Sequence, residues 1–475
     1  MQTAPSEGRG FRVPSWLLRF RRRFINLCRS FLPLPRSSAA RNSRMDLREL
    51  IASQTDVALS LSKQVLLTTE AKNSNAVLSP VSIDVVLSLI AAGSKGPTQD
   101  QLLSYLKTKS VEHLNAFSSE LVSVVFSDGS GAGGPNLAFA NGVWVDKSIS
   151  LRPFFEHVVD NVYKAASDQV DFQTKAAEVA KGVNAWAEKQ TKGVIKEVLP
   201  SGAVDNTTRL VFANALYFKG AWNDKFDASA TKDHDFHLLS GSSIKVPFMT
   251  SKKKQFVSQF DGFKVLSLPY KQGEDKRRFS MYFFLPDSKD GLPALKQGEE
   301  DKPGFSMHIF LPDSQHGLPA LVERAGSEPG FSSRHIPRRR ELVGEFRIPR
   351  FKLSFGFDAW NTLKGLGLVL PFSNEAELNE MVDSSVVGSS TLSLSSLFHK
   401  SVVEVNEEGT EAAATSVGVI CSRSLPERID FVADHPFMFL ITEGLTGRVL
   451  FSGHVTTGKV AFSNTHRATF FRSVT

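Results

Sequence analysis

The chain has 475 residues, 41% of them apolar and 22% charged, which excludes a disordered polymer and indicates a globular protein with a sizeable core. Its formal net charge is +7, but residues 1–44 hold ten Arg, no Lys and one Glu, so the remainder carries a net charge of only −2. We therefore expect no nucleic-acid partner, and no membrane contact either, because no run reaches the ~20 apolar residues of a membrane span.

Residues 1–44 form a basic extension that we expect to be separate from the folded body. The segment Arg19 to Arg23 interrupts its apolar residues, so it lacks the apolar centre of a secretory signal. Its Arg-rich, acid-poor composition is typical of a transit peptide; the interpretation we favour is a disordered or wrongly assigned extension upstream of Met45. The two cysteines, Cys28 and Cys421, suit a reducing compartment. We expect a cytoplasmic protein, with extracellular or organellar placement through residues 1–44 as the alternative.

Helical periodicity begins after residue 45, and a second apolar run, 83–92, ends at Gly93, a plausible helix stop. Ser79 and Ser82 stand close to Pro80 at the start of that run. Either serine is a candidate nucleophile by residue type alone. A hydroxyl beside a helix-opening proline more often caps the helix, so we expect capping residues here.

Several short motifs do not fit an enzyme. The segment Gly129 to Gly134 matches the dinucleotide pattern G-x-G-x-x-G, but Pro135 follows where that motif needs a helix, so we expect a flexible surface loop. His234 and His237 are three residues apart with no third metal ligand beside them. No nucleophile elbow, P-loop or zincin motif occurs. We predict no catalytic residues, no cofactor and no metal site.

An internal repeat occupies residues 271–321. Thirteen of the 17 residues from Phe279 to Leu295 recur identically from Phe305 to Leu321. Two units are too few for a solenoid, so the repeat is a local duplication or an error in the gene model. We expect one copy to pair in a sheet and the other to loop out around Gly298 to Gly304, which would expose an apolar strand.

Strand-like alternation marks the region beyond the repeat. Glu345 to Ser354 alternates like a strand, and two further strand-like stretches are 437–442 and 448–455. The stretch Glu407 to Ser424 is unusual because its alternate residues are small and uncharged over one face: Thr410, Ala412, Ala414, Ser416 and Gly418. Such a segment suits either a buried strand or an Ala-rich helix or linker.

Taken in order, these and other stretches resemble the serpin family, in its plant type. The resemblance covers about Met45 to Val455, and five stretches carry it: Asn75–Ser82, Phe212–Trp222, Leu397–Lys400, Glu407–Ser416 and Ile429–Phe437. It implies an α+β serpin fold with a large mixed central β-sheet, two smaller sheets, about eight to nine helices and an exposed reactive loop. It also implies that the strands 437–442 and 448–455 pair in a smaller sheet. We place the serpin domain at 45–456 and a C-terminal tail at 457–475.

The resemblance also implies site residues. The loop hinge comprises Glu407, Glu408, Gly409, Thr410, Glu411, Ala412, Ala413, Ala414, Thr415 and Ser416. Counted from this hinge, the reactive bond is Arg423–Ser424, and Arg428 ranks lower because it lies too near the returning strand. The region where the main sheet opens comprises Ser79, Ser82, Asn214, Trp222, Arg350 and His399. Within it, Arg350 is expected to pair with Glu407, and His399 to lie near Asn214 and Ser82.

The implied function is that of a serine-type endopeptidase inhibitor acting as a suicide substrate. A protease attacks the carbonyl of Arg423, and the loop then inserts into the main sheet and traps the acyl-enzyme. The expected partners are trypsin-like serine proteases, with Arg-specific cysteine proteases as a second class, and the chain is expected to be monomeric. Two alternatives stay open. One is a non-inhibitory serpin, because the segment after Arg423 is short and the chain holds a duplication; the other is a hydrolase using Ser79 or His399.

Overall fold

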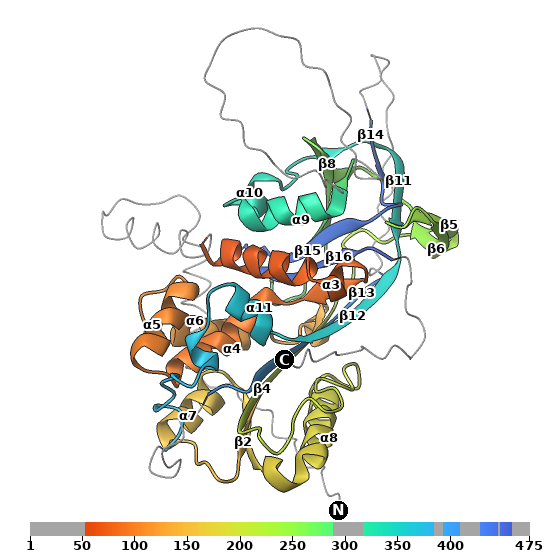
Figure 1. Ribbon diagram of the computed structural model, residues 1–475. Coiled ribbons are helices and arrows are strands. Elements are labelled where there is room, and N and C mark those ends of the chain that lie inside the picture. Colours follow the sequence, from red (N-terminus) through yellow and green to blue (C-terminus); the bar gives the residue numbers. More distant parts are fainter. Residues whose placement is uncertain (1–52, 288–316, 384–392, 409–427, 445–446, 458–475) are drawn as a thin grey trace, which may run out of the picture. The chain divides into compact units, whose positions relative to one another are not determined.

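The computed structural model describes residues 53–287, 317–383, 393–408, 428–444 and 447–457 (Figure 1). All of them lie in one of the two units of the chain, residues 50–475. They form three β-sheets and ten α-helices, where the resemblance implied eight to nine helices. Two helices of a single turn account for the difference. The α+β class is confirmed.

The sheet that carries the site has five described strands. Its order is β12 (Phe351–Asp358), β13 (Ser396–Val405), β4 (Leu210–Lys219), β2 (Asn136–Asp146) and β3 (Ala166–Val170). Strand β13 is antiparallel to β12 and parallel to β4, while β4 is antiparallel to β2. The central strand β4 is buried along nearly its whole length, which its continuous apolar sequence predicts.

Side-chain alternation divides this sheet between two layers. In β4, Phe212 and Leu216 belong to the main core, whereas Val211 and Ala213 pack in a second cluster with Phe172 and other residues of α8 (Phe172–Gln190). Helix α4 (Pro80–Ala92) packs against β4 and is buried along its whole length. Figure 1 shows α8 beside β2 and α4 nearer the middle of the molecule.

A second sheet has seven described strands. Its order is β1 (Ala76–Leu78), β16 (Val449–Val455), β15 (Phe437–Glu443), β9 (Phe279–Pro286), β8 (Phe263–Pro269), β7 (Gln255–Phe260) and β10 (Arg340–Glu341). The C-terminal strands β15 and β16 pair here. The expectation that they lie in a smaller sheet is therefore wrong, because two short edge strands, β1 and β10, lengthen this sheet beyond the five-stranded one.

The third sheet has four described strands, in the order β14 (Ile429–Val432), β11 (Val343–Pro349), β6 (Ser243–Met249) and β5 (Lys232–His237). His234 and His237 lie on β5, and because strand residues three apart face opposite sides, they do not converge on a metal. The predicted strand 345–354 is two strands, β11 and β12, which divide at Arg350.

The helices are 53–66, α3 (Thr69–Lys72), α4, α5 (Gly96–Tyr105), α6 (Val111–Glu120), α7 (Pro153–Asn161), α8, α9 (Gly317–Ser327), α10 (Phe331–Arg334) and α11 (Trp360–Gly365). A π turn, Leu121–Val125, and three 3-10 turns, Ser130–Ala132, Ala228–Ala230 and Leu370–Phe372, complete the set. The glycine-rich stretch holds one of these turns and leads into strand β2, which agrees with a loop and excludes the dinucleotide motif. None of the described helices is long and apolar enough to cross a membrane.

Within its described residues, 271–287 and 317–321, the duplicated segment places a strand from the first copy in a sheet and the start of a helix from the second copy. Strand β9 comes from the first copy and pairs with β8 and β15. Helix α9 comes from the second copy, and its Leu318, Leu321 and Val322 are buried. One copy pairs in the sheet, as expected, through the strand of the first copy. The expectation that the other copy loops out is corrected at its end, because the last residues of the second copy begin helix α9. The segment 298–304 lies outside the described residues.

Candidate functional site

The site is the junction between β4 and β13, which we call the seam. The two strands pair in parallel from Ser396↔Val211 to Val403↔Phe218. Their outer neighbours, β12 and β2, are antiparallel to them. The chain leaves β13 at Val405 and enters the predicted hinge at Glu407. A segment that turned back from this hinge would run antiparallel to both strands of the seam.

A buried polar cluster crosses the seam in its middle. Asn141, Asn214 and His399 lie directly opposite one another on β2, β4 and β13. The Asn214 side-chain oxygen lies 2.6 Å from His399 Nδ1 and 2.8 Å from the Ser82 hydroxyl, and its amide nitrogen donates to Asn141. The Ser79 backbone N–H donates to His399 Nε2 over 3.0 Å. Helix α4 is therefore bonded to both strands of the seam.

These bonds determine the protonation state of His399. Its Nε2 accepts the Ser79 N–H, so the proton of the neutral ring sits on Nδ1 and is donated to Asn214. Burial lowers the pKa of His399 to about 3. A second ring proton would make Nε2 of His399 a donor, facing the N–H donor of Ser79 with no acceptor between them. The polar cluster therefore requires a neutral imidazole.

Ser79 occupies the helix-capping position. Its hydroxyl accepts the N–H of Ser82 at the start of α4, Pro80 is the first helical residue, and Gly93 ends the helix. The capping interpretation of Ser79 is confirmed. The hydroxyl of Ser82 instead points to the Ser79 carbonyl and to Asn214. Both serines are fully buried.

The described part of the hinge lies at the end of the seam where the chain leaves β13. Arg350 Nη1 lies 3.3 Å from both carboxylate oxygens of Glu407. The indole N–H of Trp222 donates to the Asn406 carbonyl over 2.8 Å, and the Trp222 backbone N–H donates to the Glu408 carbonyl over 3.4 Å. The hinge is thus held by an ion pair on one side and an aromatic residue on the other.

Lys219 bridges the seam beside the hinge. From the end of β4 its Nζ lies 3.0 Å from Glu404 on β13 and 3.4 Å from Glu408. Lys352 on β12 adds a second cation 3.5 Å from Glu404. Two acids and two lysines therefore tie β4, β12, β13 and the hinge together. We call this group the hinge ion network.

The remaining predicted site residues lie outside the described residues. These are Gly409, Thr410, Glu411, Ala412, Ala413, Ala414, Thr415 and Ser416 of the hinge, and Arg423 and Ser424 of the reactive bond. Arg428, ranked below Arg423 as a reactive residue, is the first described residue after the loop and is exposed. The roles given to all of these residues stay predictions.

The whole described arrangement agrees with one known family. The family model for "Serpin (serine protease inhibitor)" matches residues 52–301 and 301–457. The chain belongs to the serpin family. The two matched parts meet inside the duplicated segment, as expected if the family model accommodates a single copy.

Curated plant relatives are similar over most of this serpin. It is 55% identical to "Serpin-ZX" of Arabidopsis thaliana over 414 residues, which are 86% of this chain and 99% of the relative. It is 53% identical to "Serpin-ZXA" of Oryza sativa subsp. japonica, over 86% of this chain and 98% of the relative. The predicted plant serpin-Z type is confirmed. The family is one of serine protease inhibitors.

Solved structures agree with the fold. The Arabidopsis AtSerpin1 structure, titled as the native stressed conformation, matches with a TM-score of 0.77 and 53% identity, over 87% of this chain and 98% of that one. Uncleaved ovalbumin matches with a TM-score of 0.67 and 22% identity, over 86% of this chain and 99% of that one, which shows the fold alone.

Sequence reasoning missed three residues that this serpin places in the site. Ser401 lies 2.7 Å from His399 Nε2, Asn141 bonds Asn214, and Lys219 anchors the hinge ion network. Asn141 and Lys219 could have been identified as candidates from the sequence, because each is a polar residue inside or at the end of a strongly apolar strand. Their partners depend on pairing between distant strands, which spacing in the sequence does not reveal.

The serine and histidine contacts do not make an accessible catalytic site. Ser401 and His399 meet the distance for a nucleophile and a base, but both are fully buried and the other ring nitrogen faces an amide oxygen. No group of three or more His, Cys, Asp or Glu that could hold a metal occurs within the described residues. Nothing in the described site fits a cofactor.

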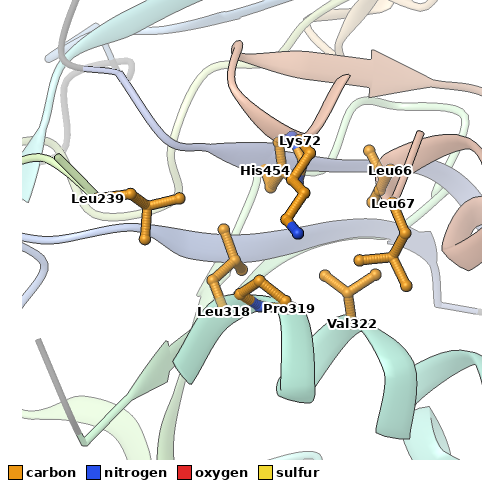
Figure 2. A pocket seen from close by; sticks show the side chains of 8 residues that line it. All are labelled: Leu66, Leu67, Lys72, Leu239, Leu318, Pro319, Val322 and His454. Carbon is orange, nitrogen blue, oxygen red and sulfur yellow. The ribbon is translucent and has the colours of Figure 1, made fainter. Parts of the chain in front are cut away.

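A small pocket lies apart from the seam, since none of its lining residues belongs to β4 or β13. Figure 2 shows it beside α9, with Leu318, Pro319 and Val322 on one wall and His454 on another. The remaining lining residues are Leu66, Leu67, Lys72 and Leu239. Burial lowers the pKa of His454 to about 4, and its Nε2 lies 3.0 Å from two backbone carbonyls. The lining is otherwise almost entirely apolar, which gives a ligand few polar contacts.

Proposed function

We propose that this serpin inhibits Arg-specific proteases as a suicide substrate, is not itself an enzyme, and is cleaved at Arg423–Ser424. After cleavage, the segment from Thr410 enters the seam as a new strand. One observation carries the proposal: β4 and β13 are parallel neighbours, and the hinge leads directly out of the end of β13. A strand inserted there replaces one parallel pairing with two antiparallel ones.

The free energy of insertion has a clear physical source. Each added backbone hydrogen bond contributes on the order of 1 kcal/mol net, and antiparallel pairs are slightly more stable than parallel ones. The face that would turn toward α4 and the polar cluster is small and uncharged, with Thr410, Ala412 and Ala414 on it. A new strand with small residues can pass into a packed sheet with little cavity or steric cost.

Insertion also explains how a protease would be trapped. The protease forms an acyl-enzyme with Arg423, fourteen residues beyond Gly409. Fourteen extended residues span on the order of 45 Å. Insertion would therefore carry the acylated protease far from its docking position before water hydrolyses the ester. The uncleaved form must then be held by kinetic barriers, and the contacts across the seam supply them.

Arg423 supports the choice of protease class. A guanidinium pairs best with a buried carboxylate, which is the specificity group that Arg-specific proteases present. Arg428 is the rival, but it directly precedes β14, which pairs with β11. A protease would have to pull β14 from its sheet to reach that bond.

The test is to incubate the purified chain with trypsin and to resolve the products on a denaturing gel. A covalent band of serpin plus protease, with the new amino terminus at Ser424, supports the proposal. Arg423→Gln should abolish both, whereas Arg428→Gln, which removes the same charge a few residues away, should change neither. Cleavage at Arg423 without a covalent band would instead support the second candidate, a non-inhibitory serpin. The short segment after Arg423 and the duplication favour that candidate.

A further inference from the structure

Six exposed cations gather at the edge of the seven-stranded sheet. Lys252, Lys253 and Lys254 directly precede β7, and Arg338 and Arg339 lead into β10, of which Arg340 is the first residue. The pairing of β10 with β7, with Arg340 opposite Phe256, brings the two runs to the same edge. All six are exposed, and the exposed fraction is 51% for the Lys253 side chain and 38% for that of Arg340. We call these six residues the basic edge.

One carboxylate holds the middle of the basic edge in place. Arg340 Nη2 lies 2.8 Å from Asp224 Oδ2, and Lys253 Nζ lies 3.6 Å from the other oxygen. The Arg340 guanidinium also stands 4.9 Å from the centre of the Phe256 ring. The other four cations make no ion pair with any described residue. A folded body whose net charge is near zero thus concentrates positive charge in one place.

Both described ends of the reactive loop lie next to the basic edge. Trp222, which donates to the Glu408 carbonyl at the start of the loop, is two residues before Asp224. At the far end, Ile429 pairs with Val343, three residues after Arg340. A protease that attacks the loop between these ends would therefore dock close to the basic edge. Surface lysines and arginines are usually only solvated, but these lie where a docking partner arrives.

We propose that the basic edge is an exosite for an acidic surface on the protease that attacks the reactive loop. The inference rests on the proposed function, since it concerns the same encounter. A protein partner fits better than a polyanion because Leu342, two residues after Arg340, is 39% exposed and offers apolar contact. Two acidic residues, Asp224 and Glu341, also lie among these cations, and their negative charge would repel a polyanion.

The expected effect is on the rate of encounter. Charges at the rim of an interface mainly change the association rate and its salt dependence, and steering raises association rates by roughly 10-fold to 1,000-fold. Screening at an ionic strength of 1 M reduces the Debye length to about 3 Å, which removes most of this effect. The exosite therefore predicts faster attack by an acidic protease than by a basic one of equal specificity, at low salt only.

The experiment compares anionic and cationic trypsin, which share Arg specificity and differ in surface charge. The readout is the second-order rate constant for attack on the loop, whether the product is a covalent complex or cleaved serpin. The test variant carries Lys252→Gln, Lys254→Gln, Arg338→Gln and Arg339→Gln, leaving the Asp224 contacts intact. The control carries Lys107→Gln, Lys109→Gln, Lys181→Gln and Lys189→Gln, four exposed residues on or near α5 and α8. Figure 1 shows these helices far from β14.

At low salt the wild-type chain should react about tenfold faster with anionic than with cationic trypsin, and the control should keep most of that ratio. The test variant should bring the ratio close to one. Equal ratios in the test variant and the control would overturn the proposal. The proposal would also be overturned if the test variant kept the wild-type rate ratio but lost the binding to dextran sulfate that the wild-type chain and the control show. The basic edge would then be a polyanion site. Failure of the proposed function is visible separately, as cleavage without a covalent complex.

Discussion

Arg350 and Glu407 meet where β13 gives way to the hinge, with Nη1 of Arg350 3.3 Å from both carboxylate oxygens. The arginine stands in the link between β11 and β12, and the glutamate begins the segment that is proposed to move. Their side chains are 32% and 12% exposed, so solvent screens this pair less than a surface pair. The pair ties the start of the loop to a part of the fold that insertion leaves in place.

Removing this ion pair should lower the kinetic barrier that prevents the uncleaved loop from inserting into the seam. Glu407→Gln keeps the size of the side chain and removes the ion pair, which contributes about 1 kcal/mol at this exposure. We expect the variant to lose inhibitory activity on incubation about fivefold faster than the wild-type chain. Residual trypsin inhibition, followed over time at a fixed temperature, measures this. A double variant with Arg350→Gln separates the pair from the other contacts of Arg350, and a coupling near zero would contradict the assignment.

Lys219 offers a second test of the barrier, on the other side of the hinge. Lys219→Met leaves Glu404 and Glu408 without the cation that they share, so the hinge should leave the seam more readily. We expect activity to decay up to about fivefold faster than in the wild-type chain, with the difference shrinking at high salt. Lys181→Met, an exposed lysine on α8, is the matched control. Equal decay rates for the two variants would show that the hinge ion network does not hold the hinge.

The duplication predicts that either copy alone is sufficient. Deleting residues 291–316 joins β9 to α9 through the four residues 287–290 and restores a single copy, so this variant should melt at or above the temperature of the full chain. Deleting residues 279–304 instead substitutes the second copy's strand, with Ile309 in place of the fully buried Phe283. That exchange should cost roughly 1–2 kcal/mol in stability. Loss of folding in the first deletion would mean that residues 291–316 are needed, contrary to the use of one strand and one helix.

The polar cluster predicts a pH dependence. The pKa of His399 is about 3 in the folded chain, far below its usual value, because burial disfavours the charged ring. Between about pH 6.5 and 3 the unfolded chain therefore binds a proton that the folded chain does not. Above pH 6.5 His399 is neutral in both states and does not disfavour folding. As the pH falls below 6.5, protonation of the unfolded chain raises the unfolding constant by up to about tenfold per pH unit.

Other buried groups change the total pH dependence, so the comparison must be made between variants. Burial raises the pKa of Asp84 to about 7, and that shift stabilises the folded chain as the pH falls. The difference between the wild-type chain and His399→Gln isolates the histidine. The melting temperature of the wild-type chain should fall further between pH 7 and pH 5 than that of the variant. A parallel response of both chains would contradict a neutral, buried His399.

Much of the fold follows from local sequence, whereas the contacts of the site do not. The apolar stretch of β4 and the Ser79–Pro80 start of α4 are readable from residue order and spacing. The bridge from Lys219 to Glu404 is not, because the two residues are 185 positions apart and meet only through the register of β4 and β13. The sequence also does not reveal that the first repeat copy supplies the sheet strand and the second copy the start of the helix. Their sequences are nearly identical, so local propensity does not choose between them.

Strand insertion at the seam is the central claim, and thermal unfolding before and after cleavage of the reactive loop tests it most directly. Cleavage within residues 409–427 should raise the melting temperature of the wild-type chain well above that of the intact form. Thr410→Arg, which would bury a charge, should prevent most of that rise, whereas Thr415→Arg, on the opposite face of the inserted strand, should not. A cleaved wild-type chain that melts at or below the intact one would contradict insertion.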